Sequence, residues 1–424
     1  IRCLEFKFMV PLDHSDPQGT PLFLHAKLVY DHYLPGKPEP KTRSNWKDIV
    51  RARKNPDLLL YLCGGPGDDN TLKNPALKKA AMARGYYVLF VDYRGTGRSS
   101  AITRVPDRGA EYLAMFRQDN IVRDLEAIRL CLAKELLSKQ KPEPELKFSL
   151  LGQSFGGWII LTYLSFLPSS LKRVGIHAGL PPLGKSAEAV YRQTFKEVIK
   201  RNEDYYKKYP GDVDRVRDIV AKLEENPHKF TPEIYGTTHT VTGRTFLTVG
   251  RTLGVEGGGK DIHQLVECMF NDLKSGDKLS DETCKRYLEC LGFKLNERPL
   301  YGVMHESIYC SGSGASRWAA KRVALEEQGD KFSWIDDNIL TKLERYTGEL
   351  YFSGEMIYPF MLKYSGDALR AFEKVAEELA CKRDWPQLYD LEQLGKNAVE
   401  ARAIVYPDDM YVAGKLSEET VPMV

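Results

Sequence analysis

The sequence predicts an α/β fold: a mostly parallel sheet with helices on both faces and a large, mainly helical cap insertion. Two observations carry this prediction. Short apolar runs alternate with helical stretches between Leu58 and Gly179, which is typical of parallel strands joined by helical crossovers. After Gly179 the strand-like runs give way to charged amphipathic helices.

The expected strands are short and apolar. Four lie in the first part of the chain and one near its end: Leu58–Leu62, Tyr86–Asp92, Lys147–Leu151, Arg173–Gly179 and Ala403–Tyr406. Between the second and third runs, apolar residues recur at helical spacing from Ile121 to Leu132, behind Asp119, which can cap a helix. A βαβ unit therefore leads into the segment that carries Ser154.

The order of these elements divides the chain into three parts. Residues 1–179 are expected to form the first part of the α/β core, residues 180–346 the helical cap, and residues 347–424 the second part of the core. Two glycine-rich stretches inside the cap, residues 254–260 and 310–316, are expected to be loops.

Composition excludes several classes of partner. Lys and Arg number 61 against 58 Asp and Glu, so no field over the whole molecule would recruit nucleic acid or an anionic membrane. No apolar run reaches the roughly 18 residues that span a bilayer. We expect a soluble, cytoplasmic protein that acts on a neutral or small molecule, and the sequence leaves a homo-oligomer open.

The eight cysteines are scattered, without a C-x-x-C or a Cys/His spacing that would hold zinc. We expect buried, reduced thiols and no metal site. A disulfide between Cys284 and Cys290 stays open.

The chemistry centres on the stretch Gly152-Gln-Ser154-Phe-Gly156, which follows an expected strand and opens an expected helix. A sharp strand-to-helix turn needs small residues on both sides of the nucleophile, because a Cβ there would clash. Such a turn also aims the N–H of Phe155 at a developing oxyanion. Ser154 is therefore predicted to be a nucleophile.

Two further loops follow expected strands. The stretch "CGGPGDDN" from Cys63 to Asn70 exposes backbone N–H groups, and Gly65 is predicted to be the second oxyanion donor. In "VDYRGTGRSS", Asp92 and Arg94 are interpreted as scaffold residues that hold the loops by hydrogen bonds and charge pairing.

These motifs together resemble the proline iminopeptidase (prolyl aminopeptidase) family of α/β-hydrolases, in its larger branch with a big helical cap. The similarity is carried by Gly-Gly-Pro-Gly, Asp-x-Arg-Gly-x-Gly-x-Ser and Gly-Gln-Ser-x-Gly-Gly, in this order and spacing. It extends to "VPLDHSDP", "HESIYC", "SGEMIYP", "DWPQLYD" and "DDMYV", and so to nearly the whole chain. Cys63 is a departure, because many relatives carry His or Gln there.

The resemblance implies hydrolysis of the bond after an N-terminal proline in peptides, through an acyl-enzyme and without metal or cofactor. Ser154 would be the nucleophile, Phe155 and Gly65 the oxyanion donors and Asp409 the acid of a Ser–His–Asp triad. Glu306 of "HESIYC" would bind the substrate's ammonium group. A second carboxylate is expected for the same task, with the choice between Glu355 and other cap residues left open.

The base is the open question, because every histidine precedes Asp409: His14, His25, His32, His177, His228, His239, His263 and His305. In this fold the histidine follows the acid, beyond one further strand. Three explanations compete: recruitment of His177 or His305, a natural pseudoenzyme, or a chain that continues past residue 424 to the missing strand and histidine. We favour the third.

Two other functions stay open at this stage. An esterase or a broader aminopeptidase of the same fold would share Ser154, Gly65 and Asp409 but would need no carboxylate for an amine. A non-catalytic, hydrolase-like binding protein would keep the fold and lose the triad.

Overall fold

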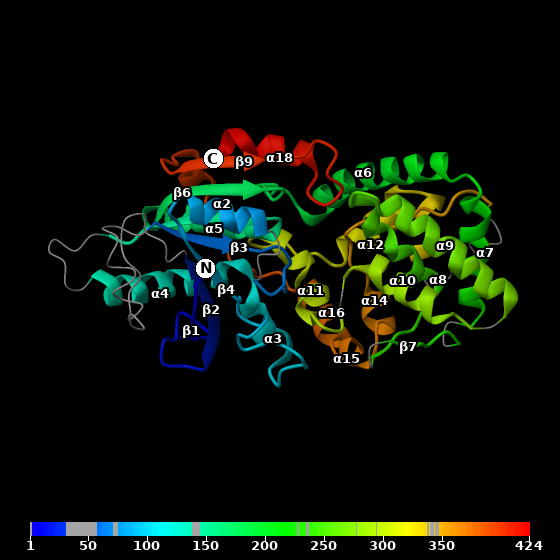
Figure 1. Cartoon of the computed structure of the whole chain (residues 1–424), viewed down its shortest axis with the longest axis horizontal. Coiled ribbons are helices and arrows are strands. Elements are labelled where there is room, and N and C mark those ends of the chain that lie inside the picture. The colour runs from blue at the N-terminus through cyan, green and yellow to red at the C-terminus, as the bar shows by residue number, and fades with distance from the viewer. Residues whose placement is uncertain are drawn as a thin grey trace.

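The computed structural model places most of the chain in one sheet and a surrounding set of helices (Figure 1). It describes the following residues: 2–30, 57–70, 75–137, 145–226, 229–234, 237–276, 278–293, 295–336, 339, 343 and 347–424.

The central sheet has seven strands in the order β1-β2-β4-β3-β5-β6-β9. Its bounds are β1 (Arg2–Pro11), β2 (Pro21–Tyr30), β3 (Leu58–Leu62), β4 (Tyr87–Val91), β5 (Phe148–Gln153), β6 (Leu171–His177) and β9 (Glu400–Ile404). The first two strands form an antiparallel hairpin on β4, and the other five run parallel. The predicted α/β class is therefore correct.

Four of the five expected strands coincide with observed ones within two or three residues at either end. The last one is displaced: β9 ends at Ile404, where the N–H of Ala178 donates to the Ile404 carbonyl, and not at Tyr406. Because β9 lies at the edge of the sheet and all its residues are exposed, it begins Glu-Ala-Arg and contains no continuous apolar run.

Helices cover the sheet from both sides. They include α2 (Pro75–Ala83), α4 (Gln118–Leu137), α5 (Phe155–Phe166), α17 (Leu391–Gly395) and α18 (Gly414–Thr420). Helix α5 is apolar all round and almost wholly buried, since it packs on β5, β3 and β6 on one side and on α4 and α17 on others. This buried helix fixes the direction of the residue that precedes it, Ser154.

The rest of the chain forms a helical lobe beside the sheet (Figure 1). Its longer helices are α6 (Ala187–Lys208), α7 (Asp212–Glu225), α9 (Gly258–Ser275), α10 (Asp281–Leu291) and α12 (Ala319–Glu327). Shorter ones are α8 (Gly243–Leu247), α11 (Pro299–Met304), α14 (Pro359–Tyr364), α15 (Asp367–Arg370) and α16 (Glu373–Cys381). The lobe also contains two short antiparallel strands of two residues each, β7 (Glu233–Ile234) and β8 (Thr237–Thr238).

The lobe continues beyond the cap boundary that the sequence predicts. Helix α14 contacts α8, and α16 contacts α11, so residues between 359 and 381 pack with cap helices. Tyr346, the last residue of the predicted cap, lies outside the described residues. Of the glycine-rich stretches, 310–316 is a loop, whereas Gly258 already begins α9.

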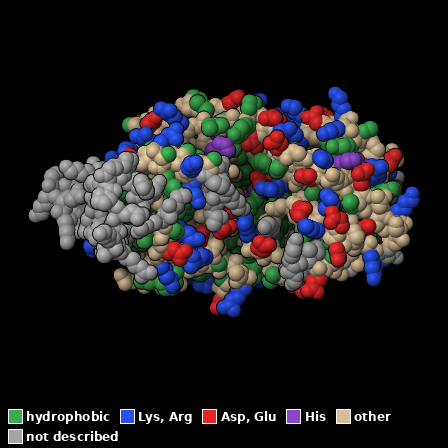
Figure 2. Space-filling view, in the orientation of Figure 1, with side chains coloured by type: hydrophobic (Ala, Val, Ile, Leu, Met, Phe, Trp, Pro, Cys, Tyr) green, Lys and Arg blue, Asp and Glu red, His purple; other side chains and the backbone are tan. Residues whose placement is uncertain are grey.

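The surface carries charges of both signs, interspersed over the visible face (Figure 2). No helix in the described part of the chain has the length and apolar character needed to cross a membrane.

All eight cysteines are free, so the disulfide between Cys284 and Cys290 that the sequence left open is not formed. Four are buried, while Cys3, Cys131 and Cys381 are exposed.

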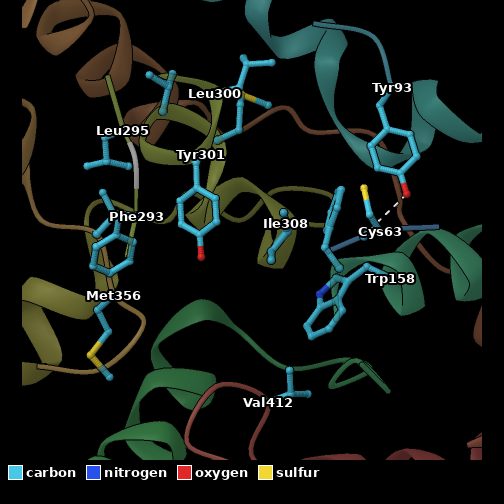
Figure 3. Packing of buried hydrophobic residues seen from close by; sticks show 14 of the residues in the cluster. Cys63, Tyr93, Trp158, Phe293, Leu295, Leu300, Tyr301, Ile308, Met356 and Val412 are labelled. Atoms are coloured by element: carbon cyan, nitrogen blue, oxygen red, sulfur yellow. Dashed lines mark hydrogen bonds between the residues drawn. The ribbon is translucent and has the colours of Figure 1, made fainter. Parts of the chain in front are cut away.

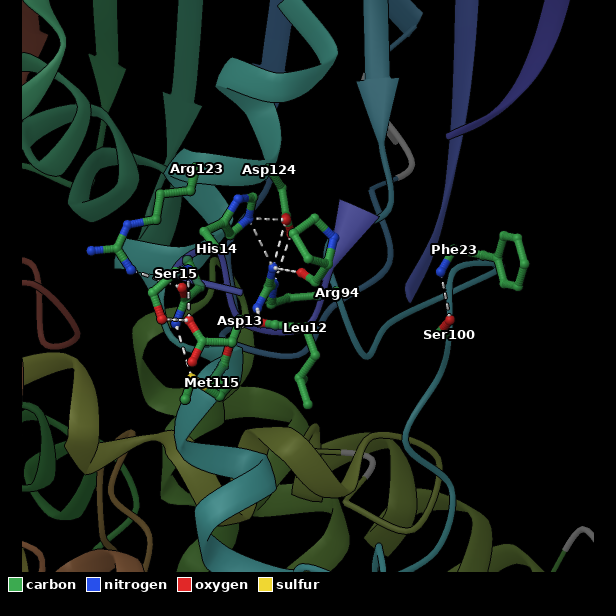
Figure 4. Close-up of polar contacts among 12 residues, drawn as sticks. Leu12, Asp13, His14, Ser15, Phe23, Arg94, Ser100, Met115, Arg123 and Asp124 are labelled. Carbon is green, nitrogen blue, oxygen red and sulfur yellow. Dashed lines mark hydrogen bonds and ion pairs between the residues drawn. The ribbon is translucent and has the colours of Figure 1, made fainter. Parts of the chain in front are cut away.

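The buried guanidinium of Arg94 forms hydrogen bonds with several segments of the core (Figure 4). Its guanidinium donates to both carboxylate oxygens of Asp124 on α4, through Nε at 2.7 Å and Nη2 at 2.5 Å. Nη1 also donates to the carbonyls of Leu12 and Met115. Asp92 accepts from the N–H groups of Asn70 and Arg98. The scaffold role predicted for Asp92 and Arg94 is confirmed.

Arg94→Met should destabilise the fold by about 3 kcal/mol, because the buried Asp124 carboxylate would lose its guanidinium partner and keep only the contact with His14 Nε2. Arg98→Met is the matched control: its ion pair with Glu5 is exposed, with 59% and 49% of the two side chains accessible, and should contribute less than about 1 kcal/mol. Urea unfolding of both variants measures the difference. Similar losses in both would contradict the scaffold role.

Candidate active site

Ser154 occupies a strained backbone position between β5 and α5. Its φ of 50° and ψ of −124° lie where residues with a side chain rarely occur. The Ser154 N–H donates to the His177 carbonyl of the neighbouring strand at 3.1 Å, and the Ser154 carbonyl accepts from Gly157 at 2.7 Å. The turn is therefore held by its surroundings on both sides of the serine.

The glycines around Ser154 are required by close backbone contacts. A Cβ on Gly156 would lie 2.2 Å from the Leu62 carbonyl oxygen of β3. One on Gly157 would lie 1.8 Å from the Gly179 carbonyl oxygen, and one on Gly179 would lie 2.2 Å from the Ser154 carbonyl oxygen. The nucleophile turn predicted from the motif is thus packed directly against two neighbouring strand ends.

Two backbone segments lie beside Ser154, the start of α5 and the loop after β3. Phe155 is the first residue of α5, so its N–H has no acceptor within the helix and points out of the helix end. The loop after β3 passes beside the serine: a Cβ built on Gly64 would lie 3.6 Å from the Ser154 Oγ. Gly65, the predicted second donor, follows directly in this loop with a φ of 129°.

The two aspartates after β9 have different environments. Asp408 pairs with Arg201 at 2.7 Å on the surface. Asp409 is half-buried, and its Oδ1 accepts from the N–H groups of Tyr411 at 2.8 Å and Val412 at 3.1 Å. Within the described chain no group donates to its Oδ2, which is left for a further donor. Asp409 is thus the one whose carboxylate is oriented by the fold.

Burial raises the pKa of Asp409, and the nearby charges of Glu355 and Asp408 add to this effect. The two backbone hydrogen bonds act in the opposite direction and do not cancel it. A positively charged partner would restore the ionised form.

No imidazole ring of the described histidines bonds to Ser154 or Asp409; the contact of His177 with Ser154 is through its backbone carbonyl. The Nε2 of His177 lies 2.9 Å from the Tyr406 hydroxyl. His14, His25 and His263 contact other carboxylates. His305 is buried against Tyr301, and neither of its ring nitrogens has a hydrogen-bond partner within the described chain; burial lowers its pKa. His32 and His228 lie outside the described residues.

Glu306 is buried, and its carboxylate lies at the N-terminus of α12, where both of its oxygens accept hydrogen bonds. They accept from the N–H groups of Ala319 and Ala320, each at 3.0 Å. Burial raises the pKa of Glu306 to about 7 against these hydrogen bonds. The geometry is that of a helix N-terminal cap, so these contacts do not favour the amine-binding role predicted for Glu306.

Glu355 is the carboxylate that the sequence left undecided. Its Oε1 accepts from Arg251 Nε at 3.0 Å and from the Tyr301 hydroxyl at 2.6 Å, and its Oε2 accepts no bond within the described chain. Burial tends to raise its pKa, but the charges of Arg251 and His305 and the Tyr301 hydrogen bond outweigh this, and the pKa lies below its usual value. Glu355 is therefore ionised at neutral pH, near enough to Asp409 to affect its pKa.

Buried apolar side chains of the α/β core and of the helical lobe form one continuous cluster. Figure 3 shows Cys63, Tyr93 and Trp158 from the core with Tyr301 and Ile308 from the lobe. A cavity of about 500 Å³ lies beside Trp158, one helical turn after Ser154, between residues 182–188, 308–315 and 387–391.

In the described part of the chain, no group of three or more His, Cys, Asp or Glu side chains is arranged to hold a metal ion.

The strand order, the strained serine at the end of β5 and the carboxylate after the last parallel strand define the chain as an α/β-hydrolase. Comparison with known proteins narrows this class. No family model matches the chain. An α/β-hydrolase from Penicillium, GrgF, aligns with 50% of the chain and 54% of its own length at 15% identity and a TM-score of 0.28, too weak a likeness to support an argument.

Two curated relatives match over nearly the full chain. "Proline iminopeptidase aneH" of Aspergillus aculeatus is 34% identical over 100% of this chain and 87% of its own length. The "Proline iminopeptidase" of Aeromonas sobria is 32% identical over 99% of this chain and 89% of its own. The chain belongs to the proline iminopeptidase family, and it is an enzyme of the hydrolase class.

Proposed function

We propose that this enzyme releases an N-terminal proline from peptides through an acyl-enzyme intermediate. The observation that supports the proposal is the strained turn at Ser154, which lies directly before the N-terminus of α5 and beside the glycine loop that follows β3. The relatives' names supply the substrate class. The route needs neither metal nor cofactor.

In the first step the Ser154 Oγ attacks the carbonyl carbon of the proline residue while a histidine takes the hydroxyl proton. The N–H groups of Phe155 and Gly65 stabilise the resulting oxyanion. The C–N bond then breaks, and the histidine gives its proton to the leaving amine. Water adds to the acyl-enzyme by the same sequence, which frees proline and restores Ser154. Asp409 orients the histidine through its Oδ2.

The base of this proposal is a histidine on a segment that covers the outer edge of β9, where no described residue is paired. Support comes from the edge itself: every residue of β9 is exposed, and Ile404 keeps 57% of its surface accessible. An open edge strand presents unpaired backbone groups that a further strand can cover.

Recognition of the substrate's charged end is assigned to Glu355. The proline nitrogen of the substrate is a protonated secondary amine, and a buried carboxylate with one unbonded oxygen is a suitable partner. Glu306 remains a candidate for this role only if its two helix N–H bonds are exchanged for the amine. A simple esterase would need neither carboxylate, so a comparison of proline arylamides with aryl esters separates the two functions.

Ser154→Ala should give a folded protein whose turnover of proline arylamide is lower by several orders of magnitude. The variant should also resist labelling by a fluorophosphonate, since this reagent reacts with an activated serine. Both measurements use the full-length protein, and circular dichroism controls for folding. Near-normal turnover in the variant is incompatible with the proposed mechanism.

Glu355→Gln should weaken transition-state binding of proline arylamide by about 2 kcal/mol, or roughly 30-fold in kcat/KM, because a charged hydrogen bond is lost. Hydrolysis of an aryl ester that lacks an amine should change little. Glu306→Gln is the matched comparison, and its main effect should be a lower melting temperature through the cap of α12. If Glu355→Gln slowed both substrates equally, its role would be structural; if only Glu306→Gln were amine-selective, the roles would be reversed.

His177→Gln and His305→Gln should each keep kcat/KM within about tenfold of the unchanged full-length enzyme, since neither ring contacts Ser154 or Asp409. Loss of a triad histidine would instead remove several orders of magnitude. Steady-state kinetics on proline arylamide decides this point, and a collapse in either variant would identify the base within residues 1–424.

A further inference from the structure

The oxyanion loop, defined as residues 64–69, is joined to the helical lobe by one arginine. Arg298 donates from Nη1 to Asp68 Oδ1 at 2.5 Å and from Nη2 to Asp69 Oδ1 at 3.1 Å. The arginine side chain keeps 20% of its surface accessible, and the two aspartates keep 31% and 35%. A guanidinium that bonds two adjacent carboxylates fixes both the distance and the angle of the loop.

The same place is a backbone contact between loop and lobe. Arg298 directly precedes α11, and a Cβ on Gly67 would lie 2.8 Å from the Tyr301 backbone nitrogen and 3.2 Å from the Leu300 Cβ. Gly67 also has a φ of 97°, a left-handed conformation that glycine adopts more readily than residues with a side chain. Loop and helix therefore touch without an intervening side chain.

Helix α11 reaches the other half of the site as well. Its third residue, Tyr301, donates its hydroxyl to Glu355 at 2.6 Å. At its flanks the loop is held by the core, because the Tyr93 hydroxyl donates to the Cys63 carbonyl and the Asn70 N–H donates to Asp92. Arg298 and α11 thus set the middle of the oxyanion loop relative to Glu355.

We propose that Arg298 is a positioning residue, which holds the oxyanion loop in register with the amine-binding carboxylate through Asp68 and Asp69. The inference rests on the proposed function and adds to it that oxyanion stabilisation depends on the lobe being docked on the core. Oxyanion contacts act in the transition state more than in the bound substrate, so loosening them lowers kcat more than it raises KM.

The test is Arg298→Gln in the full-length protein. We expect kcat to fall about 10-fold to 100-fold on proline arylamide and by a similar factor on an aryl ester without an amine, with KM changed less than about threefold. This equal loss on both substrates differs from the amine-selective loss expected for Glu355→Gln. The control is Arg192→Gln, which removes a two-bond arginine–carboxylate pair with Glu327 inside the lobe and should leave kcat unchanged.

The loop-side variant Asp68→Asn/Asp69→Asn keeps the test valid if Arg298→Gln folds poorly. It should reproduce the loss in kcat, and combining it with Arg298→Gln should add little further loss, because both changes break the same contact. An unchanged kcat in either single-side variant, a loss confined to KM, or fully additive losses would overturn the proposal. Absence of proline arylamide turnover and fluorophosphonate labelling in the unchanged enzyme would instead remove the proposed function itself.

Discussion

The candidate site depends on the close backbone packing that holds Ser154 in its strained conformation. Gly156 lies against the end of β3 and Gly157 against Gly179, so the start of α5 touches the segments on both sides of β5. Strain of this kind persists only where the surroundings over-determine it. The buried, all-apolar α5 and the parallel strands beside it provide those surroundings.

The four carboxylates considered for the site differ in their hydrogen-bond partners. Asp408 pairs with a surface arginine, and Glu306 caps a helix. Asp409 is fixed through one oxygen by two backbone N–H groups, and Glu355 through one oxygen by Arg251 and Tyr301. Only the last two combine partial burial with an oxygen that accepts no bond within the described residues. The proposed function accordingly gives catalysis to Asp409 and substrate recognition to Glu355, because hydrogen bonding leaves these two carboxylates with an oxygen that accepts no bond within the described residues.

The helical lobe participates in the site and does not merely cover it. Glu355, which Tyr301 of the lobe holds by a hydrogen bond, lies close enough to raise the pKa of Asp409 in the core. Arg298 connects the same lobe to the oxyanion loop. Arg298 and its two aspartates are more than 200 residues apart in sequence, so this contact forms only when the lobe and the core are packed together.

The sequence by itself determined the features that depend on local constraints. The α/β class, four strands within a few residues, the turn at Ser154 and the scaffold roles of Asp92 and Arg94 all follow from short motifs, because glycine spacing and apolar periodicity act within a few residues. The strand β9 was displaced in the sequence prediction since an exposed edge strand needs no apolar run.

Only the tertiary structure decided which groups meet across long separations. It directed Glu306 to the N-terminus of α12 and paired Glu355 with Arg251 and Tyr301. It also bonded the His177 ring to Tyr406 and stacked the His305 ring on Tyr301, so neither ring bonds to Ser154 or Asp409. The physical reason is that a carboxylate or an imidazole has the same local sequence signal whether it caps a helix, pairs with an arginine or faces a substrate. Its role is set by the partners that folding brings within hydrogen-bond distance.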